Sequence, residues 1–224
     1  MCAMSLHEIL HHSLSLLERV LVEHGPERTA VAWTGGKDST IVLSLWRRVL
    51  AGRGPLCAVT LDTGCKFPEI VAFRERIAAE WEVGLHVARP EVSLDGYPLA
   101  VDKVACCRAL KIEPLRKAVR DIGVTALLTG IRRDEHPSRR EREFTEPRTD
   151  PDHLLVNPLL DWTEMDVWAH ITGSGLPYCE LYDRGYRSLG CRPCTAPPGG
   201  ESERSGRDPD KEANLGLLHS LGYF

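Results

Sequence analysis

The sequence feature that most constrains the fold is a polar, glycine-rich hexapeptide between an apolar run and a helical run. It reads Thr34, Gly35, Gly36, Lys37, Asp38 and Ser39. Residues 30–33 before it are apolar, and residues 40–50 after it carry their large apolar side chains on one side. This order of strand, glycine-rich turn and helix predicts an α/β fold with the hexapeptide at the carboxyl end of a strand.

The hexapeptide also has the chemistry of an anion site. Adjacent glycines let the backbone approach a ligand closely, and the amides of a helix N-terminus carry partial positive charge. Lys37 adds a cation, while Thr34 and Ser39 add hydroxyl donors. The alternative is an ordinary turn in which Asp38 or Ser39 caps the helix. The glycine spacing is too short for the Walker lysine loop.

Apolar runs elsewhere in the chain alternate between strand and helix patterns. Further strands are predicted at residues 56–61, 83–87 and 124–129, and further helices at 6–21, 68–81, 113–122 and 163–174. This alternation predicts a doubly wound, mostly parallel sheet. Residues 89–103 are interpreted as a loop over the site. Residues 137–148 are rich in charge and fit equally a solvated loop or a mobile basic lid.

Candidate site residues follow two of the predicted strands. Asp62 and Thr63 come directly after residues 56–61, and Gly130 follows residues 124–129. Ligands of open α/β sheets bind at the carboxyl ends of the strands. We therefore expect these residues to line the same crevice as the hexapeptide.

The length of the chain, 224 residues, allows one substantial core. We predict an N-terminal covering helix in residues 1–25, a nucleotide-binding domain in residues 26–195 and an irregular tail in residues 196–224. The formal net charge of -4 argues against a general polyanion-binding surface. No apolar run is long enough to span a membrane and the N-terminus lacks signal-peptide features, so a cytoplasmic location is predicted.

Four of the eight cysteines form a second constellation, in two pairs far apart in the sequence: Cys106, Cys107, Cys191 and Cys194. In a reducing compartment such thiols are metal ligands rather than disulfides. Four sulfurs suit either tetrahedral zinc or a [4Fe-4S] cluster, and adjacent cysteines suit the wider cluster better. Four buried free thiols are the alternative. The other cysteines are expected to be packing or incidental thiols: Cys2, Cys57, Cys65 and Cys179.

These motifs resemble those of a known superfamily. Residues 34–39 resemble the Ser-Gly-Gly-x-Asp-Ser loop of the PP-loop ATP pyrophosphatases, with Thr34 in the first hydroxyl position. Residues 106–115 and 186–195 resemble the cluster-binding sequences of bacterial and plant-type adenylylsulfate (APS) reductases. The resemblance implies an adenine nucleotide α-hydrolase-like fold and a [4Fe-4S] cluster on the four cysteines. It also implies that Lys111 lies between cluster and substrate.

Two features depart from the reductase pattern. The APS reductases that this chain resembles attack the sulfate sulfur with a cysteine in a C-terminal segment. In this chain, residues 213–219 contain leucine in its place and no cysteine follows Cys194. Leucine cannot replace a thiolate nucleophile. The second departure is a set of segments that resembles the small, nucleotide-binding subunit of the bacterial heterodimeric ATP sulfurylase, which carries no cluster: residues 62–69, 130–135, 202–208 and 221–224.

Together these resemblances predict an enzyme of the PAPS reductase family that binds an adenine nucleotide (ATP, or else APS or PAPS) in sulfur metabolism. The main hypothesis is cleavage of ATP between the α- and β-phosphates, with release of pyrophosphate and activation of an oxygen as an adenylate. Lys37 and Ser39 would cradle the phosphates, and Asp38 would help to hold Mg²⁺. Arg132 and Arg133 would stabilise charge on the α-phosphate or a bound oxyanion.

The resemblance also indicates partners and alternatives. Cluster-containing ATP pyrophosphatases serve in thiolation and DNA phosphorothioation, which implies a cysteine desulfurase or another sulfur-transfer protein as partner, with nucleic acid reached through such partners. One alternative is an APS or PAPS reductase that uses thioredoxin, with Cys65 as the candidate nucleophile. The others are an adenylyltransferase like the ATP sulfurylase small subunit, with a GTPase partner, and a non-catalytic redox-sensing protein that binds a nucleotide.

Overall fold

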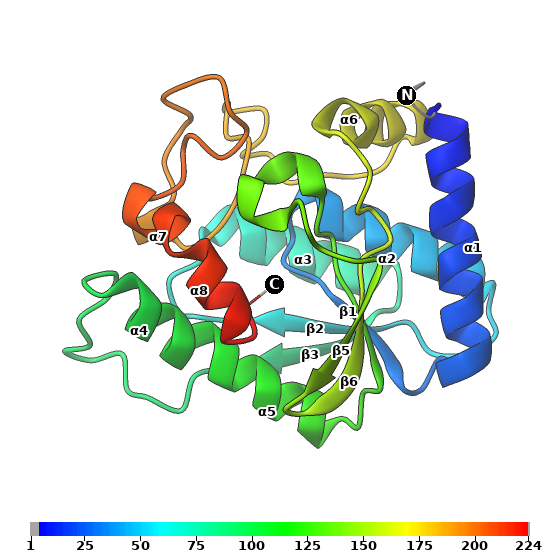
Figure 1. Cartoon of the computed structure of the whole chain (residues 1–224), viewed down its shortest axis with the longest axis horizontal. Helices are drawn as coiled ribbons and strands as arrows, with labels where there is room; N and C mark the ends of the chain where they lie inside the picture. The colour runs from blue at the N-terminus through cyan, green and yellow to red at the C-terminus, as the bar shows by residue number, and fades with distance from the viewer. Residues whose placement is uncertain (1–4, 224) are drawn as a thin grey trace.

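A six-stranded sheet positions the functional segments (Figure 1). The computed structural model describes residues 5–223. The strand order is β3-β2-β1-β4-β6-β5, with β5 antiparallel to β6 and the other neighbours parallel. The strands are β1 (Thr29–Ala32), β2 (Cys57–Leu61), β3 (Gly84–Ala88), β4 (Ala126–Leu128), β5 (Thr145–Thr149) and β6 (Asp152–Val156).

Helices cover both faces of this sheet. The longer ones are α1 (Leu6–His24), α2 (Lys37–Leu50), α3 (Pro68–Glu80), α5 (Glu113–Asp121) and α6 (Glu164–Ser174). The shorter ones are α4 (Lys103–Cys107), the π-helical turn η1 (Arg108–Ile112), the 3-10 turns η2 (Arg133–Glu135), η3 (Pro137–Arg139) and η4 (Arg192–Cys194), and α7 (Pro209–Ala213) and α8 (Leu215–Ser220). Within residues 5–223, no helix has the length and apolar character needed to cross a bilayer.

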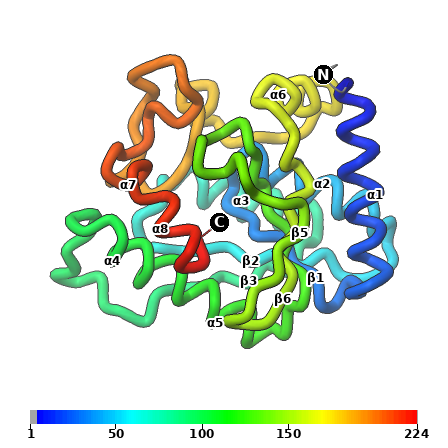
Figure 2. Tube along the Cα trace, viewed as in Figure 1, coloured from blue at the N-terminus to red at the C-terminus, as the bar shows by residue number. Residues whose placement is uncertain are grey.

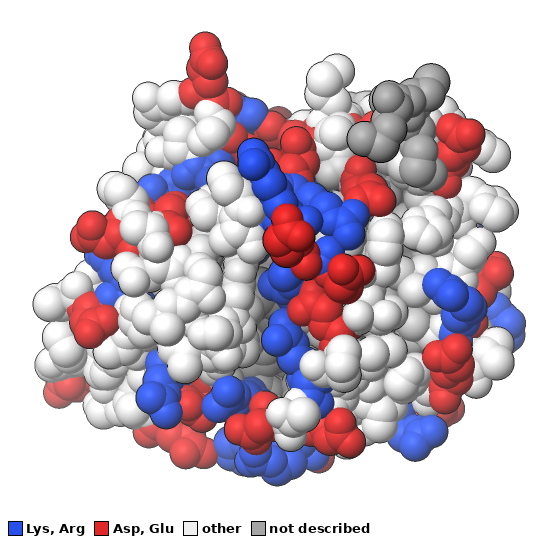
Figure 3. Space-filling model, viewed as in Figure 1, with Lys and Arg blue, Asp and Glu red and all other residues white. Residues whose placement is uncertain are grey.

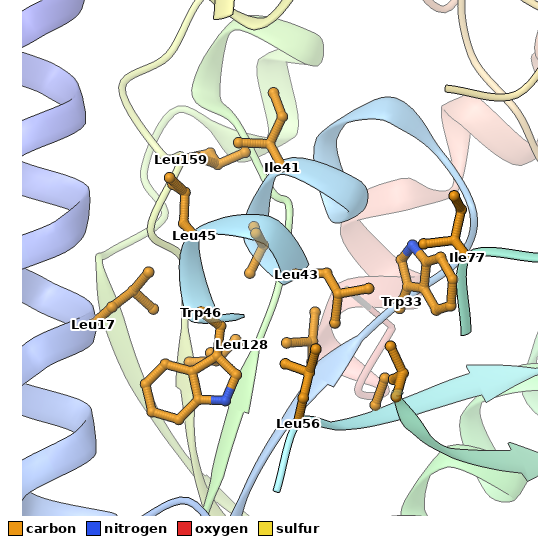
Figure 4. Close-up of a cluster of buried hydrophobic side chains, with 14 of the residues drawn as sticks. Leu17, Trp33, Ile41, Leu43, Leu45, Trp46, Leu56, Ile77, Leu128 and Leu159 are labelled. Atoms are coloured by element: carbon orange, nitrogen blue, oxygen red, sulfur yellow. The ribbon is translucent and has the colours of Figure 1, made fainter. Parts of the chain in front are cut away.

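Alternation along β1 divides the core into two layers. Val31 and Trp33 face the layer of α1, α2, α3 and α6, whereas Ala30 and Ala32 face α5. Figure 4 shows Trp33 within the first layer, near Leu43 of α2 and Ile77 of α3. Full burial of one such side chain contributes roughly 1.5–3 kcal/mol. The two layers therefore hold β1, and with it the hexapeptide that follows, in a fixed position.

The predicted fold class, a doubly wound and mostly parallel α/β sheet with an irregular C-terminal tail, is confirmed. Two strands were not foreseen: β6, for which no strand was predicted, and the edge strand β5, which forms from part of residues 137–148, predicted as a loop or lid. Strand β5 has no apolar alternation and contains Pro147, which an edge strand tolerates. Its identity as a strand comes from pairing with β6 rather than from its own sequence.

A second difference concerns the segment before α5. The sequence predicts a loop over residues 89–103 and a helix from Glu113, whereas the helical run begins at Lys103 and passes through α4 and η1 into α5. Asp102 caps it by accepting hydrogen bonds from the amides of Val104 and Ala105, both at 2.9 Å. Pro114 predicts the first turn of a helix, but in the structure it follows the π-helical turn η1. The division into residues 1–25, 26–195 and 196–224 stays a prediction.

Candidate functional site

The hexapeptide forms a closed turn between β1 and α2. The Thr34 amide donates to Ser39 Oγ at 3.2 Å, and the two hydroxyl oxygens lie 3.1 Å apart. Gly36 is the N-cap of α2, and the Lys37 amide donates to the Tyr182 hydroxyl at 2.9 Å. The N-terminal end of α2, with its partial positive charge, therefore faces the turn and favours an anion there.

Gly130 brings the end of β4 against this turn. A Cβ atom at Gly130 would lie 2.7 Å from the Ser39 amide nitrogen and 2.9 Å from the carbonyl carbon of Asp38. Both are backbone atoms that cannot move aside cheaply, so the approach requires glycine. Gly130 and the turn consequently border the same cavity.

This cavity is bordered by the turn on one side and by basic side chains on the others. The turn contributes Thr34, Gly36, Lys37, Asp38 and Ser39. The basic side chains come from the segment before α3, from η1, from η3 and from the tail: Lys66, Lys111, Arg139, Arg204 and Arg207. Figure 3 shows Lys and Arg running down the middle of this face of the molecule, interleaved with Asp and Glu.

Three of these cations lack an acidic partner. Within residues 5–223, no carboxylate forms an ion pair with Lys66, Lys111 or Arg207, and the Nε atom of Arg207 is buried without a hydrogen-bond partner. Lys111 and Arg207 are each 6% exposed. Burial lowers the pKa of Lys66. Burial would lower the pKa of Lys111, but Tyr223 and the thiols of Cys191 and Cys107 raise it. Because none of these groups is a carboxylate, an anionic ligand would still compensate the three cations, and this wall of the cavity suits one.

The Arg207 guanidinium occupies the space that a side chain at position 190 would need. A Cβ atom at Gly190 would lie 2.3 Å from Nη1 of Arg207 and 2.4 Å from Nη2. The backbone of Arg207 is held by a turn of the tail, in which the Ala196 amide donates to the Gly206 carbonyl at 2.8 Å and residues 195 and 207 form a β-bridge. The tail thus presents Arg207 at a defined position.

Lys37 and Arg132, two of the cations predicted to hold phosphate or oxyanion, are already paired within the protein. Lys37 Nζ donates to Glu203 Oε1 at 2.5 Å, and Arg132 Nε donates to Asp38 Oδ1 at 2.7 Å. The side chains of Lys37 and Arg132 are 1% and 0% exposed. Burial would lower the pKa of Lys37, but the charges of Asp38 and Glu203 raise it above its ordinary value.

The structure does not bring Arg132 or Arg133 to the cavity. Arg132 lies behind the turn because its guanidinium is bonded to Asp38 and Glu203. Arg133 donates to Asp161 and to the Arg142 carbonyl, and it packs over the Phe144 ring. The guanidinium groups that do border the cavity are supplied by η3 and the tail instead.

Two further predicted residues point elsewhere. Asp62 accepts from the Gly64 amide at 3.0 Å and pairs with Arg89 at 3.4 Å. Thr63 Oγ1 lies 3.2 Å from Cys191 Sγ, so this hydroxyl faces the cysteines rather than the turn. Gly35 shapes the turn with a φ of 81° without bordering the cavity.

The four predicted cysteine ligands come together in a small pocket. Cys106 and Cys107 at the end of α4 line it together with Cys191, the N-cap of η4, and Cys194, the last residue of η4. Cys65, interpreted from sequence as a packing thiol, lines the same pocket.

Lys111 borders both this cysteine pocket and the cavity. Burial would raise the pKa of Cys191, but the ammonium groups of Lys111 and Lys66 lower it to about 6. The four predicted ligands therefore line one pocket beside two cations, a set of donors that suits an anionic metal–thiolate centre.

The tail packs against Cys107, one wall of the cysteine pocket. Leu215 and Leu218 of α8 are fully buried and pack with Cys107 and Ile112. In Figures 1 and 2 the tail lies beside α4, with α8 next to the helical run. Residues 213–219, which hold leucine where the resembled reductases carry a cysteine, thus form an apolar cover.

Three carboxylates gather at the edge of the cavity. Oxygens of Asp38, Glu135 and Glu203 all lie within 4.8 Å of one another. Each is also paired with a cation: Asp38 with Arg132, Glu203 with Lys37, and Glu135 with Arg139. These oxygens are the ligands of this region that would suit Mg²⁺.

Sequence reasoning missed the residues that complete the cavity, Lys66, Arg139, Arg204, Arg207 and Tyr182. A signal was present for the arginines, because residues 137–148 and 202–208 were singled out for charge and for resemblance. Nothing in the sequence, however, indicated that these two segments meet beside the turn, where Arg139 and Arg204 both pair with Glu135. Lys66 likewise stands in residues 62–69, singled out for resemblance, whereas for Tyr182 no pattern distinguishes a site residue from a core residue.

Comparison with known proteins agrees with this geometry. The model of the phosphoadenosine phosphosulfate reductase domain family matches residues 28–197, which include the turn and the four cysteines but not residues 198–224. An adenosine 5'-phosphosulfate reductase of Anoxybacillus flavithermus is 34% identical over 194 residues, covering 83% of this chain and 80% of that protein.

Two crystal structures are similar in fold. Phosphoadenylyl-sulfate (PAPS) reductase from Candida auris has a TM-score of 0.70 at 24% identity and covers 87% of this chain and 99% of that one. FMN adenylyltransferase from Candida glabrata has a TM-score of 0.68 at 20% identity and covers 89% of this chain and 67% of that one. With the family match over most of its length, the chain belongs to the phosphoadenosine phosphosulfate reductase family of sulfur-metabolism enzymes.

Proposed function

We propose that the protein binds an adenine nucleotide at two points, the α-phosphate at the turn and a second anionic group (the β- and γ-phosphates of ATP or the sulfate of APS) at Lys66, Lys111 and Arg207. The observation that carries this proposal is that these buried or half-buried cations, in the cavity that the turn borders, have no carboxylate partner among residues 5–223. A phosphate or sulfate oxyanion would compensate their charge through charge-assisted hydrogen bonds. The amides at the start of α2 and the hydroxyls of Thr34 and Ser39 would supply the first point of binding.

We further propose that reaction takes place at phosphorus rather than at sulfur. Within residues 5–223, no thiol borders the cavity, and an attack on sulfate sulfur needs a thiolate. The reaction would be displacement at the α-phosphate of ATP by an oxygen of the acceptor, with pyrophosphate leaving. Lys111 and Arg207 would stabilise charge on the leaving or incoming anion, since positioning and pre-placed charge supply most of the catalysis in such displacements.

Mg²⁺ and a [4Fe-4S] cluster are the cofactors that the residues fit. Asp38, with Glu135, offers carboxylate oxygens for Mg²⁺, which would neutralise phosphate charge. The cluster would be held by Cys106, Cys107, Cys191 and Cys194.

A single zinc ion fits the cysteine pocket less well than a cluster. Zinc–sulfur bonds of about 2.3 Å require thiolates about 3.8 Å apart in a tetrahedron. In the described part of the chain no three cysteine sulfurs all lie within 4.8 Å of one another. A cluster of several irons accepts a wider arrangement of sulfurs.

The adenylated acceptor would be a substrate of sulfur transfer, with the sulfur delivered by a cysteine desulfurase or a similar protein and AMP as the leaving group; a cluster beside the nucleotide would fit such a reaction. Nucleic acid would be reached through such a partner. The cytoplasm would keep these thiols reduced.

The test is product analysis with anaerobically prepared protein. ATP with Mg²⁺ should give AMP and pyrophosphate, and Ser39→Ala should reduce turnover by roughly tenfold to a hundredfold, since it removes a donor from the phosphate site. Ser44→Ala, in the middle of α2 and away from the turn, is the matched control. Absence of pyrophosphate with every acceptor tried would count against reaction at phosphorus.

The relatives favour a second candidate, an APS or PAPS reductase. The relative from Anoxybacillus is named as such a reductase. Cys65 would be the nucleophile and thioredoxin the reductant, although Cys65 lines the cysteine pocket and burial raises its pKa. Sulfur-labelled APS should then leave a thiosulfonate on wild-type protein but not on Cys65→Ser, and thioredoxin should release sulfite. An unlabelled protein and no sulfite would exclude this candidate.

A further inference from the structure

Glu203 belongs to the tail, yet its carboxylate is buried against the turn. Its two oxygens accept from different cations, Oε1 from Lys37 Nζ and Oε2 from Arg132 Nη2, both at 2.5 Å. The exposed fraction is 6% for the Glu203 side chain, 1% for Lys37 and 0% for Arg132. A buried carboxylate held by two cations fixes both position and orientation.

The remaining bonds of Lys37 also lie within the protein. An ammonium group has three donors, and Lys37 uses the other two on Asp38 Oδ2 at 3.3 Å and on the Arg187 carbonyl at 3.1 Å. Arg132 likewise bonds to Asp38 and to the Trp162 carbonyl. All three donors of Lys37 are therefore used on described residues of the protein, and Arg132 is not among the residues that border the cavity, so the lysine of the turn ties segments of the protein together.

The segment that these bonds hold carries Arg207. From Glu203 the chain passes through Arg204, which pairs with Glu135 and Glu212, and turns back so that the Arg207 amide donates to the Arg204 carbonyl at 2.8 Å. Arg207 then borders the cavity, where its Nε atom is buried without a hydrogen-bond partner and no carboxylate of residues 5–223 forms an ion pair with it. A single tight turn of the chain therefore separates Glu203, the anchor, from Arg207.

We propose that Glu203 is a positioning residue: through Lys37 and Arg132 it anchors the tail to the turn, so that Arg207 is held where the second anionic group of the nucleotide binds. This rests on the proposed two-point binding of the nucleotide. It assigns to Lys37 the role of a tether rather than of a phosphate ligand.

Loss of the carboxylate charge has a definite consequence. Glu203→Gln keeps the size of the side chain but leaves the buried Lys37 and Arg132 without one counter-ion, which weakens the anchor. Arg207 would then sample several positions. Ligands that reach Arg207 lose affinity, whereas ligands that occupy only the turn do not.

The experiment is calorimetric titration of wild-type protein, Glu203→Gln and the matched control Glu201→Gln with ATP and with AMP. Glu201 is an exposed neighbour in the same tail. Glu203→Gln should weaken ATP binding by about tenfold or more, the size expected for one charge-assisted contact, and leave AMP binding unchanged. Glu201→Gln should change neither. An unchanged ratio of ATP to AMP affinity would overturn the proposal, as would tighter ATP binding, which would instead make Glu203 a competitor of phosphate.

A cycle of variants tests the route through Lys37. If Glu203 acts through this lysine, Lys37→Met combined with Glu203→Gln should weaken ATP binding no more than either single change. Additive losses would mean that the two residues act separately and would contradict the anchor.

Tryptic digestion without nucleotide separates this proposal from the proposed function. Arg204 and Arg207 are 8% and 6% exposed, so cleavage after them reports release of the tail. Glu203→Gln should be cleaved there several-fold faster than wild type or Glu201→Gln. If wild-type protein bound neither ATP nor AMP, the proposed function would fail while this digestion still decided the anchor. Equal cleavage rates would overturn it.

Discussion

One missing side chain, at Gly130, sets the geometry of the cavity. Gly130→Ala would place a methyl group 2.7 Å from the Ser39 amide nitrogen, and the backbones would have to separate. We expect a loss of about 1–3 kcal/mol in the free energy of unfolding, as for other overpacked sites, together with loss of nucleotide binding. Urea unfolding and calorimetry measure the two effects.

Gly173→Ala is the matched control for this change. No atom lies within 4 Å of a Cβ at Gly173 in α6, so the substitution should stabilise the helix by roughly 0.5–1 kcal/mol. If Gly130→Ala proved as harmless as Gly173→Ala, the close contact between β4 and the turn would be contradicted.

His219 makes stability depend on pH. Burial and the nearby cations Arg139, Arg142 and Arg204, with His136, lower its pKa from 6.5 to about 3. Between these values the unfolded chain binds a proton that the folded chain does not. Stability from this group is therefore complete above pH 6.5 and falls as pH drops towards 3, by about 1.4 kcal/mol per pH unit.

The variant His219→Gln should remove this dependence. The slope of unfolding free energy against pH is measured by urea titration between about pH 6.5 and 4. It should be smaller than in wild type by about 1.4 kcal/mol per pH unit, the contribution of one bound proton. His11→Gln, an exposed histidine of α1, serves as control and should leave the slope unchanged. An equal slope in His219→Gln and wild type would contradict the buried neutral imidazole.

At the scale of elements, α8 packs against the cysteine-bearing helical run through Leu215 and Leu218, whereas the neighbouring Leu217 points to solvent. Leu218 is fully buried against Cys107, whereas Leu217 is 51% exposed. Leu218→Ala should weaken tail docking by about 2–5 kcal/mol, while Leu217→Ala should change it by less than about 0.5 kcal/mol. Alkylation of Cys107 in metal-free, reduced protein, followed by mass spectrometry, reports the docking. Similar alkylation rates in the two variants would mean that α8 does not cover the pocket.

Elements with their own periodicity could be predicted from the sequence, and elements made by their neighbours could not. Strand β1 and helix α2 follow from apolar runs that each face one layer of the core. Strand β5 has exposed residues at alternate positions and a proline, so only its pairing with β6 makes it a strand. The start of α4 depends on the Asp102 cap, a local signal hidden in a segment without clear period.

At the scale of the whole molecule, the predicted cavity and cysteine pocket form one unit through Lys111 and the tail. The turn, Lys111 and Gly130 could be found from sequence because each stands in or next to a recognisable motif. Arg207 and Glu203 could not be assigned, since their roles depend on how residues 196–224 fold back over the sheet. Arg132 shows the converse. It stands beside a recognisable motif, but its guanidinium is buried and bonded within the protein rather than directed at the cavity.

The cluster hypothesis predicts distinct behaviour of the cysteines. Anaerobically purified protein should contain iron and sulfide and absorb visible light, and replacing any one of the four proposed ligands with serine should remove most of both: Cys106, Cys107, Cys191 and Cys194. Cys65→Ser, in the same pocket, should keep the cluster, as should Cys57→Ser on β2. Loss of iron from Cys65→Ser would reassign the ligands, and iron-free wild-type protein would exclude the cluster.

The most direct test of the central claim, reaction at phosphorus in a nucleotide cavity shared by turn and tail, is to identify the bond of ATP that is broken. Protein, Mg²⁺ and ATP are incubated anaerobically in water enriched in oxygen-18, with water as the acceptor, and the products are weighed by mass spectrometry. We predict AMP and pyrophosphate, with the heavy oxygen in AMP, and a much lower yield from Arg207→Met. ADP with labelled phosphate, or unreacted ATP beside sulfite formed from APS, would contradict it.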